Sequence, residues 1–72
     1  MKYEVSYYFK DGKHTLLIQK KYKSDLIAYK EELEHILNHN NNKKNRKIIS
    51  FTLYRYVPQH LDFKTIIKQN IE

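Results

Sequence analysis

Five residues of this chain are candidates for acid–base chemistry on phosphate esters, because small ribonucleases use these residue types. They are His14, Tyr54, Arg55, Tyr56 and His60. Histidine transfers protons near neutral pH, and an arginine beside it can stabilise the charge that develops on a phosphate during ribonuclease-like cleavage. No motif in the sequence brings these residues to one point. We therefore predict that the protein is not an enzyme, and a small ribonuclease-like activity is the alternative.

Glu31, His35 and His39 lie four residues apart, which places them on one face of a helix that spans them. Two histidines at this spacing can share a zinc ion, although positions near the end of a helix also favour positive charge. The chain has no cysteine and no His-Glu-x-x-His motif, and one glycine is too few for a glycine-rich phosphate loop. We therefore expect no metal site, no cofactor and no nucleotide hydrolysis.

Charge is distributed unevenly along the chain. Residues 2–23 carry six lysines against two acids, a net of +4, whereas residues 24–39 carry one lysine against four acids, a net of −3. Residues 40–58 carry five cations and no acid, and the last fourteen residues are neutral. Folding of these segments predicts a molecule with a basic side, made by the sheet and a loop, and an acidic side, made by a helix.

Basic surfaces bind nucleic acid because phosphate contacts release condensed counterions. The candidate phosphate contacts are Lys43, Lys44, Arg46 and Lys47, which crowd a polar loop without an evident structural role, together with Lys10, Lys13 and Lys21. Tyrosine rings beside lysines can stack on unpaired bases, and the candidates for this contact are Tyr8, Tyr54 and Tyr56. We predict a non-enzymatic nucleic-acid-binding protein suited to a regulatory role, with DNA and RNA both open. A solvated basic surface without such a partner is the competing interpretation.

Two strands joined by a tight turn are expected at the start of the chain. Asp11-Gly12 suits a two-residue type I′ turn, which would place Tyr7 opposite Leu16 and Val5 opposite Ile18. Because strand side chains alternate, this register predicts two faces. The predicted buried face is Tyr3, Val5, Tyr7, Phe9, Leu16 and Ile18, with His14 at its end, and the exposed face includes Lys2, Tyr8, Lys10, Lys13 and Lys21.

The spacing of apolar residues predicts a helix that begins after Ser24. Its apolar face is Leu26, Tyr29, Leu33, Ile36 and Leu37, and the side chains expected to point elsewhere are Glu31, Glu32 and Glu34. A third strand is expected over residues 48–57, before Pro58. From Asp62 onward, a second apolar stripe predicts a short C-terminal helix that packs on the core or on a partner; it consists of Phe63, Ile66, Ile67 and Ile71.

The predicted fold is a single α+β domain over residues 1–72, a length that suffices for one small core. The elements follow the order ββαβ with a terminal helix. A helical crossover before the third strand favours a three-stranded antiparallel sheet of order 2-1-3, with the first strand in the centre. The long helix is expected to cover the apolar face of this sheet.

A protein partner is the alternative to nucleic acid. Phe, Tyr, Met, Ile, Asn and Lys make up 37 of the 72 residues, a bias toward A/T-rich codons that indicates a low-GC bacterium, a phage or a mobile element. A small protein of that origin can bind and inhibit a host nuclease or defence complex. Exposed edges of the second and third strands allow strand addition, so monomer and homodimer are equally open. The lack of cysteine and of a long apolar run indicates the bacterial cytoplasm and no membrane.

Overall fold

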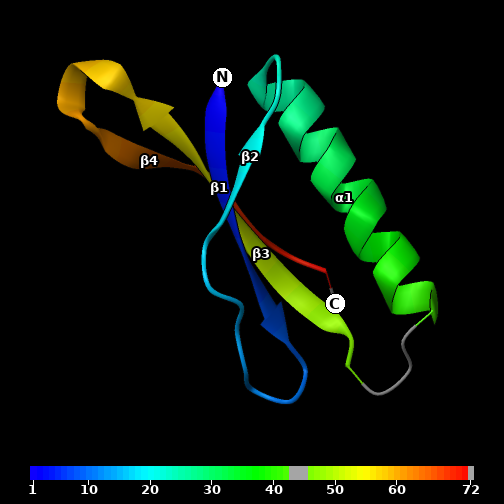
Figure 1. The fold of residues 1–72 in the computed structure, drawn as a ribbon. Helices are drawn as coiled ribbons and strands as arrows, with labels where there is room; N and C mark the ends of the chain where they lie inside the picture. Colours follow the sequence, from blue (N-terminus) through cyan, green and yellow to red (C-terminus); the bar gives the residue numbers. More distant parts are fainter. Residues whose placement is uncertain (43–45, 72) are drawn as a thin grey trace.

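Within residues 1–42 and 46–71, which the computed structural model describes, the chain forms a four-stranded antiparallel sheet with one long helix across one face (Figure 1). In chain order the elements are β1 (Lys2–Phe9), β2 (Ile18–Lys21), α1 (Asp25–Asn42), β3 (Ile48–Val57), a 3-10 turn (Pro58–His60) and β4 (Asp62–Asn70). The strand order is β2-β1-β3-β4. The predicted α+β class and the order of the first three strands are confirmed, but the sheet has a fourth strand, so β3 is not an edge.

The turn between β1 and β2 is one residue longer than predicted. The Phe9 N–H donates to the Lys13 carbonyl at 2.8 Å, and the Gly12 N–H donates to the Phe9 carbonyl at 3.0 Å, which closes a three-residue loop. In this loop only Gly12 has a positive φ, of 88°, as in a type I turn followed by a left-handed glycine. The type I′ turn predicted for Asp11-Gly12 is therefore wrong. The Asp11 side chain instead accepts the Lys13 N–H at 2.9 Å, which stabilises the longer loop.

The longer turn changes the strand pairing next to it. The Thr15 N–H donates to the Tyr7 carbonyl at 3.0 Å, so Tyr7 lies opposite Thr15 and not opposite Leu16 as predicted. The predicted pair of Val5 with Ile18 is present further along the hairpin. The second strand therefore holds an extra residue between these two pairs, and the chain bulges outward there. Leu16 is 86% exposed and Ile18 is 41% exposed, so the predicted burial of both is wrong.

The C-terminal segment is a strand, so the predicted short helix from Asp62 is wrong. β4 pairs with β3 along its whole length. The chain reverses directly after β3, through the turn at Pro58–His60 and through Leu61. Leu61 has a left-handed φ of 50°. The segment that follows contains β-branched residues, which favour strands. It lies beside the free edge of β3 and forms backbone pairs with it.

A bulge in β4 explains why its apolar residues have helical spacing. The register shifts after the pair of Leu53 with Ile67, which leaves Ile66 without a partner across the ladder. An extra residue moves the following side chains to the opposite face, so Phe63 lies on the outer face and Ile67 on the side of α1. Ile67 and Ile71 pack against the core from there. The predicted helix stripe is thus divided between the two faces of a strand.

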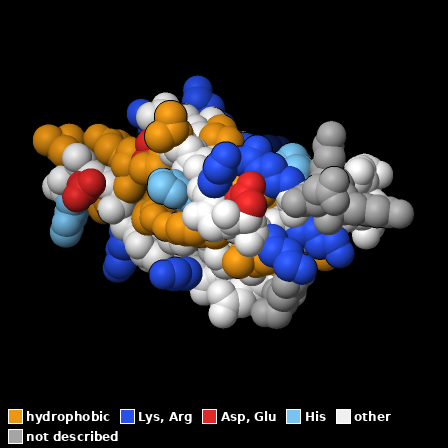
Figure 2. Space-filling model, turned by 90° about the horizontal axis from the view of Figure 1, so that it is seen from below, with side chains coloured by type: hydrophobic (Ala, Val, Ile, Leu, Met, Phe, Trp, Pro, Cys, Tyr) orange, Lys and Arg blue, Asp and Glu red, His pale blue; other side chains and the backbone are white. Residues whose placement is uncertain are grey.

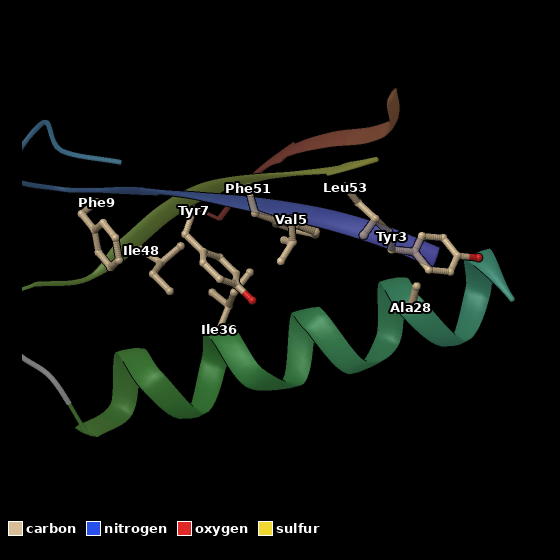
Figure 3. Packing of buried hydrophobic residues seen from close by; sticks show 9 residues of the cluster. All are labelled: Tyr3, Val5, Tyr7, Phe9, Ala28, Ile36, Ile48, Phe51 and Leu53. Carbon is tan, nitrogen blue, oxygen red and sulfur yellow. The ribbon is translucent and has the colours of Figure 1, made fainter. Parts of the chain in front are cut away.

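The core lies between α1 and the two central strands (Figure 3). Its buried apolar residues are Tyr3, Val5, Tyr7, Phe9, Ala28, Ile36, Ile48, Phe51 and Leu53. The four that come from β1 confirm the predicted buried face of that strand. The side chains of β1 and β3 point from the sheet toward the helix, which meets them with the small Ala28 and with Ile36.

The helix α1 begins as predicted but is rotated about its axis. Ser24 Oγ accepts the Ile27 N–H at 3.2 Å, as an N-cap does. Of the apolar face predicted for the helix, only Ile36 is fully buried, whereas Leu26 and Leu37 are 61% and 50% exposed. The predicted outward direction of Glu32 is also wrong, because Glu32 is fully buried against the sheet. The helix therefore turns the charged Glu32 toward the sheet, where leucines were expected.

Candidate nucleic-acid interface

One face of the sheet is covered by α1, and no helix of the described residues covers the other (Figure 1). Residues that pair across neighbouring strands share a face, so the register identifies the side chains of this uncovered surface, which we call the open face. By register this face consists of Lys2, Glu4, Ser6, Tyr8, Gln19, Lys21, Ser50, Thr52, Tyr54, Tyr56, Phe63, Thr65, Lys68 and Asn70. Ser6 and Thr52, in its middle, are buried beneath their neighbours, so the accessible surface is made by the other side chains. All three tyrosines considered for base stacking lie on it.

The three tyrosines form a row along the strand direction. Tyr54 and Tyr56 lie two residues apart on β3, and Tyr8 on β1 lies opposite Ser50, four residues before Tyr54. At about 3.3 Å per residue, these steps correspond to about 7 Å and about 13 Å along the strands. Tyr8 is 40% exposed, and the other two rings are half-buried. The open face therefore presents three aromatic side chains in line.

The neighbours of these rings extend the aromatic row. The centroid of the Tyr56 ring lies 5.3 Å from that of Phe63, and the Lys2 ammonium lies 5.2 Å from the Tyr56 centroid. At the other end of the row, the Tyr8 ring lies 5.5 Å from the His14 ring. Sequence reasoning missed Phe63 here because it placed this residue on a helix. The signal that could have found it is the strand propensity of the β-branched and aromatic residues around it.

Lysines outnumber acids on the open face. Lys2 and Lys21 lie opposite each other at one end of the β1–β2 ladder, and Lys68 adds a third cation from β4. Glu4 is the acid of this face, and its carboxylate accepts a hydrogen bond from the Gln19 amide at 3.5 Å. The three ammonium groups lie within the sheet that carries the tyrosines, so rings and cations are presented together.

Four of the predicted phosphate contacts gather at one end of the molecule. The Lys10 N–H donates to the Lys47 carbonyl at 2.8 Å, which joins the turn between β1 and β2 to the start of β3. We call Lys10, Lys13, Arg46 and Lys47 the basic end. Figure 2 looks at the molecule from this end and shows lysine and arginine side chains gathered there.

The other three predicted phosphate contacts are Lys21, Lys43 and Lys44. Lys43 and Lys44 lie outside the described residues. Lys21 lies opposite Lys2, at the far end of β1, so the structure separates it from Lys10 and Lys13, with which sequence reasoning grouped it. Lys21 belongs to the open face instead.

Arg46 is held in place by three contacts. Its guanidinium lies 4.1 Å from the centroid of the Phe9 ring, and its Nε lies 3.6 Å from an Asp11 carboxylate oxygen. Its carbonyl oxygen is 2.9 Å from His39 Nε2. The interpretation that this loop has no structural role is therefore wrong for Arg46 and Lys47, because both join it to the hairpin. Within the described residues, the three lysines of the basic end form no ion pair.

A buried carboxylate fastens α1 to the helix side of the sheet. Glu32 accepts hydrogen bonds from the hydroxyls of Tyr7 and Tyr22 and, at 3.0 Å, from the Lys20 ammonium. Burial by itself raises the pKa of Glu32, but the hydrogen bonds and the charge of Lys20 outweigh burial and hold this pKa below its usual value. Burial and the carboxylate raise the pKa of both tyrosines, which keeps them protonated as donors. The cluster is fully paired and holds the helix in one rotation.

A second acidic residue of α1 makes a similar contact near the start of the helix. Asp25 accepts a hydrogen bond from the Tyr3 hydroxyl at 2.6 Å and forms an ion pair with Arg55. Burial and the hydrogen bond to Asp25 raise the pKa of Tyr3 to about 12. The guanidinium of Arg55 therefore belongs to the attachment of the helix, on the side of the sheet opposite the open face.

These two clusters reduce the charge separation that the sequence predicts. Asp25 and Glu32 pair with Arg55 and Lys20, so sheet cations neutralise two of the four helix acids. The charges of residues 24–39 that are left are Lys30 and two exposed acids, a net of −1 where −3 is expected from the sequence. The acidic side is therefore weaker than predicted, because part of the opposite charge holds the helix to the sheet.

The residues considered for ribonuclease-like chemistry do not meet. Arg55 and His60 line one open hollow at the β3–β4 hairpin, and there Arg55 is already paired with Asp25. The two tyrosines of this set lie on the open face. His14 lies beside Tyr8, at the other end of the sheet. The described geometry therefore does not bring these five residues together around one reacting phosphate.

The histidines of α1 contact aromatic rings of β1. The His35 ring lies 5.7 Å from the Tyr7 ring, and the His39 ring lies 6.0 Å from the Phe9 ring. Within residues 1–42 and 46–71, no three His, Cys, Asp or Glu side chains gather as metal ligands would. These histidines cover the edge of the core.

The described part of the chain contains no helix that is both long and apolar enough to cross a bilayer. The chain was compared with protein-family models, with curated proteins and with solved structures, and none of the three comparisons found a match. The open face and the basic end are candidates for an interface because of their geometry and charge (Figure 2).

Proposed function

We propose that this protein binds single-stranded nucleic acid across the open face of its sheet and performs no catalysis. The observation that supports this most is the row of Tyr8, Tyr54 and Tyr56 on the uncovered face, with Lys2 and Lys21 beside it. Stacking of bases on aromatic rings tolerates any sequence, because every base has a π face, and lysines along the path contact the phosphates.

The width of the sheet favours an unpaired strand over a duplex. Four strands at a spacing of about 4.8 Å span about 14 Å between the axes of the outer strands. The major groove is about 12 Å wide and admits one helix or a two-stranded ribbon. Rings on a broad face cannot reach bases that are stacked inside a duplex, whereas a single strand can turn its bases onto them.

The basic end supplies the electrostatic part of the proposed interface. It adjoins the row of rings, since Tyr8 bridges to His14 directly after the turn that carries Lys10 and Lys13. A single-stranded nucleic acid with a base stacked on Tyr8 would have its next phosphates near these lysines. Each such contact releases counterions, so the affinity should depend strongly on salt.

Fluorescence anisotropy of a labelled oligonucleotide tests this proposal. We expect the protein to bind an unpaired oligothymidine of about 12 nucleotides more tightly than a duplex of the same length. For single strands, the slope of log K against log salt is about −0.7 for each phosphate contact. The variant K10A/K13A loses two contacts, so its slope should be less steep by about 1.4. The control K23A/K64A removes the same charge from exposed lysines outside the interface and should leave the slope unchanged. Equal slopes for both variants, or tighter binding of the duplex, would contradict the proposal.

A second candidate function, inhibition of another protein, is favoured by the exposed apolar segment at the start of β2. Leu16, Leu17 and Ile18 are 86%, 51% and 41% exposed, and they lie beside the unpaired edge of β2. A partner strand could add to this edge and cover the three side chains. The test is capture of a partner from nuclease-treated bacterial lysate by the wild type and by Leu16→Lys. Capture that resists nuclease and is lost in Leu16→Lys supports inhibition, and equal capture by both proteins contradicts it.

A further inference from the structure

The helix α1 carries a second apolar stripe that its own sheet does not cover. Leu26 and Leu37 are 61% and 50% exposed, and Leu33 lies between them and is partly exposed. Spacings of seven and four residues place the three leucines on one line along the helix. A helix that covers a sheet as the outer layer of a small domain usually turns polar side chains to solvent. These leucines are therefore not explained by the packing of one chain.

The buried cluster around Glu32 keeps this stripe outside. Turning the leucines toward the sheet would require rotating Glu32 away from Tyr7, Tyr22 and Lys20, which are its hydrogen-bond partners. That rotation would leave the buried hydroxyls and the Lys20 ammonium without their partner and would turn Ile36 out of the core. The stripe is thus a fixed feature of the folded chain and faces solvent on the helix layer, away from the open face.

We propose that α1 pairs with the same helix of a second copy of this chain, in antiparallel orientation about a twofold axis. Leu26, Lys30, Leu33 and Leu37 follow the alternating four- and three-residue steps of a coiled-coil seam. Antiparallel pairing places Leu26 against the partner's Leu37 and Lys30 against the partner's Leu33. Each of these two contacts then occurs twice in the dimer, as twofold symmetry requires, which gives four layers of side chains along the seam.

The charge pattern selects this orientation. In the antiparallel pair the stem of Lys30 lies on the partner's Leu33, and its ammonium reaches the partner's Glu34. In a parallel pair Lys30 would meet the partner's Lys30, and the two charges would repel. The helix has 18 residues and is about 27 Å long, and the seam from Leu26 to Leu37 takes up about 17 Å of it, the length of four layers of a reversible dimer.

Sedimentation equilibrium from about 10 µM to about 1 mM tests the pairing. We expect a monomer–dimer equilibrium that Leu26→Lys weakens by at least about tenfold. Leu16→Lys is the matched control, because it places the same charge on a more exposed leucine outside the helix. Circular dichroism of each variant checks that the monomer remains folded. A wild type that stays monomeric throughout, or a dimer weakened by Leu16→Lys and not by Leu26→Lys, would overturn the proposal.

A charge exchange tests the antiparallel register separately. Lys30→Glu and Glu34→Lys should each weaken the dimer, because each places like charges across the seam. Mixing the two variants should restore association, since each copy then meets the opposite charge on its partner. The double variant K30E/E34K should self-associate like the wild type. Failure of the mixture to associate more tightly than either variant alone would overturn the antiparallel arrangement.

Discussion

Glu32 is the residue on which the attachment of the helix depends most. Glu32→Ala would leave the hydroxyls of Tyr7 and Tyr22 and the Lys20 ammonium without their common partner. Removing one partner from a buried ionic cluster costs about 3–5 kcal/mol, which is a large part of the stability of so small a domain. We expect a large fall in the urea midpoint. Glu31→Ala, an exposed change on the same helix, should alter the free energy of unfolding by less than about 0.5 kcal/mol.

The same residue predicts how stability depends on pH. The pKa of Glu32 is lower in the folded chain than its ordinary value of 4.5. Its contribution is therefore present above pH 4.5 and is lost as the pH falls through the folded pKa. Urea unfolding of the wild type and of Glu32→Gln at a series of pH values measures this contribution as a difference. That difference should shrink below pH 4.5, and a constant difference down to about pH 3 would show that Glu32 is not held ionised.

Tyr54 lies in the middle of the aromatic row and tests stacking at a single position. Tyr54→Ala should weaken binding of an unpaired oligonucleotide by about 1–3 kcal/mol, because one base loses its platform. Tyr54→Phe keeps the ring and should bind as the wild type does. If the phenylalanine variant binds as weakly as the alanine variant, the hydroxyl and not the ring makes the contact.

For single residues, the sequence predicts which way a side chain points better than it predicts its hydrogen-bond partner. Alternation along β1 correctly places Tyr3 and Tyr7 in the core and Tyr8 outside. What it does not predict is that two inward tyrosines need acceptors for their hydroxyls, which Asp25 and Glu32 provide. Buried polar groups are almost always paired, so the inward tyrosines were themselves the signal for inward acids.

Among the elements, the β3–β4 hairpin has a residue in a strained conformation. Leu61 has a φ of 50° and is 81% exposed, so its side chain contributes little packing while its backbone conformation is unfavourable. Leu61→Asn should raise the free energy of unfolding by up to about 1 kcal/mol, because asparagine tolerates left-handed geometry. Thermal unfolding measures the effect. Leu16→Asn is the control, since Leu16 is also exposed and lacks a positive φ, and an equal gain there would contradict this explanation.

Element bounds with a clear start or stop signal are predictable from this sequence, whereas the bulges within strands are not. The bounds of β3 and the N-cap of α1 match the expectation, since Pro58 and Ser24 are unambiguous signals. The bulge in β4 gives a strand the apolar spacing of a helix, and the three-residue turn displaces Leu16 from the core. In both places one extra residue reverses which face a side chain occupies, and no local pattern announces it.

For the whole molecule, the two layers have different surfaces. The sheet layer carries the open face with its tyrosines and lysines, and the helix layer carries the leucine stripe. A dimer through the helices would leave both open faces accessible, so nucleic-acid binding and self-association are expected to be compatible. The sequence overestimates the separation of cations from acids, because Arg55 and Lys20 pair with acids of the helix and hold it in place.

The most direct test of the central claim is to map where an unpaired oligonucleotide binds. We predict that amide chemical shifts of the isotope-labelled protein, followed during titration with oligothymidine, change at Tyr8, Tyr54, Tyr56 and the lysines around them. The amide chemical shifts of Leu26, Leu33 and Leu37 on α1 should not change. Changes confined to the helix, or no changes at low salt, would contradict the account that the open face binds nucleic acid.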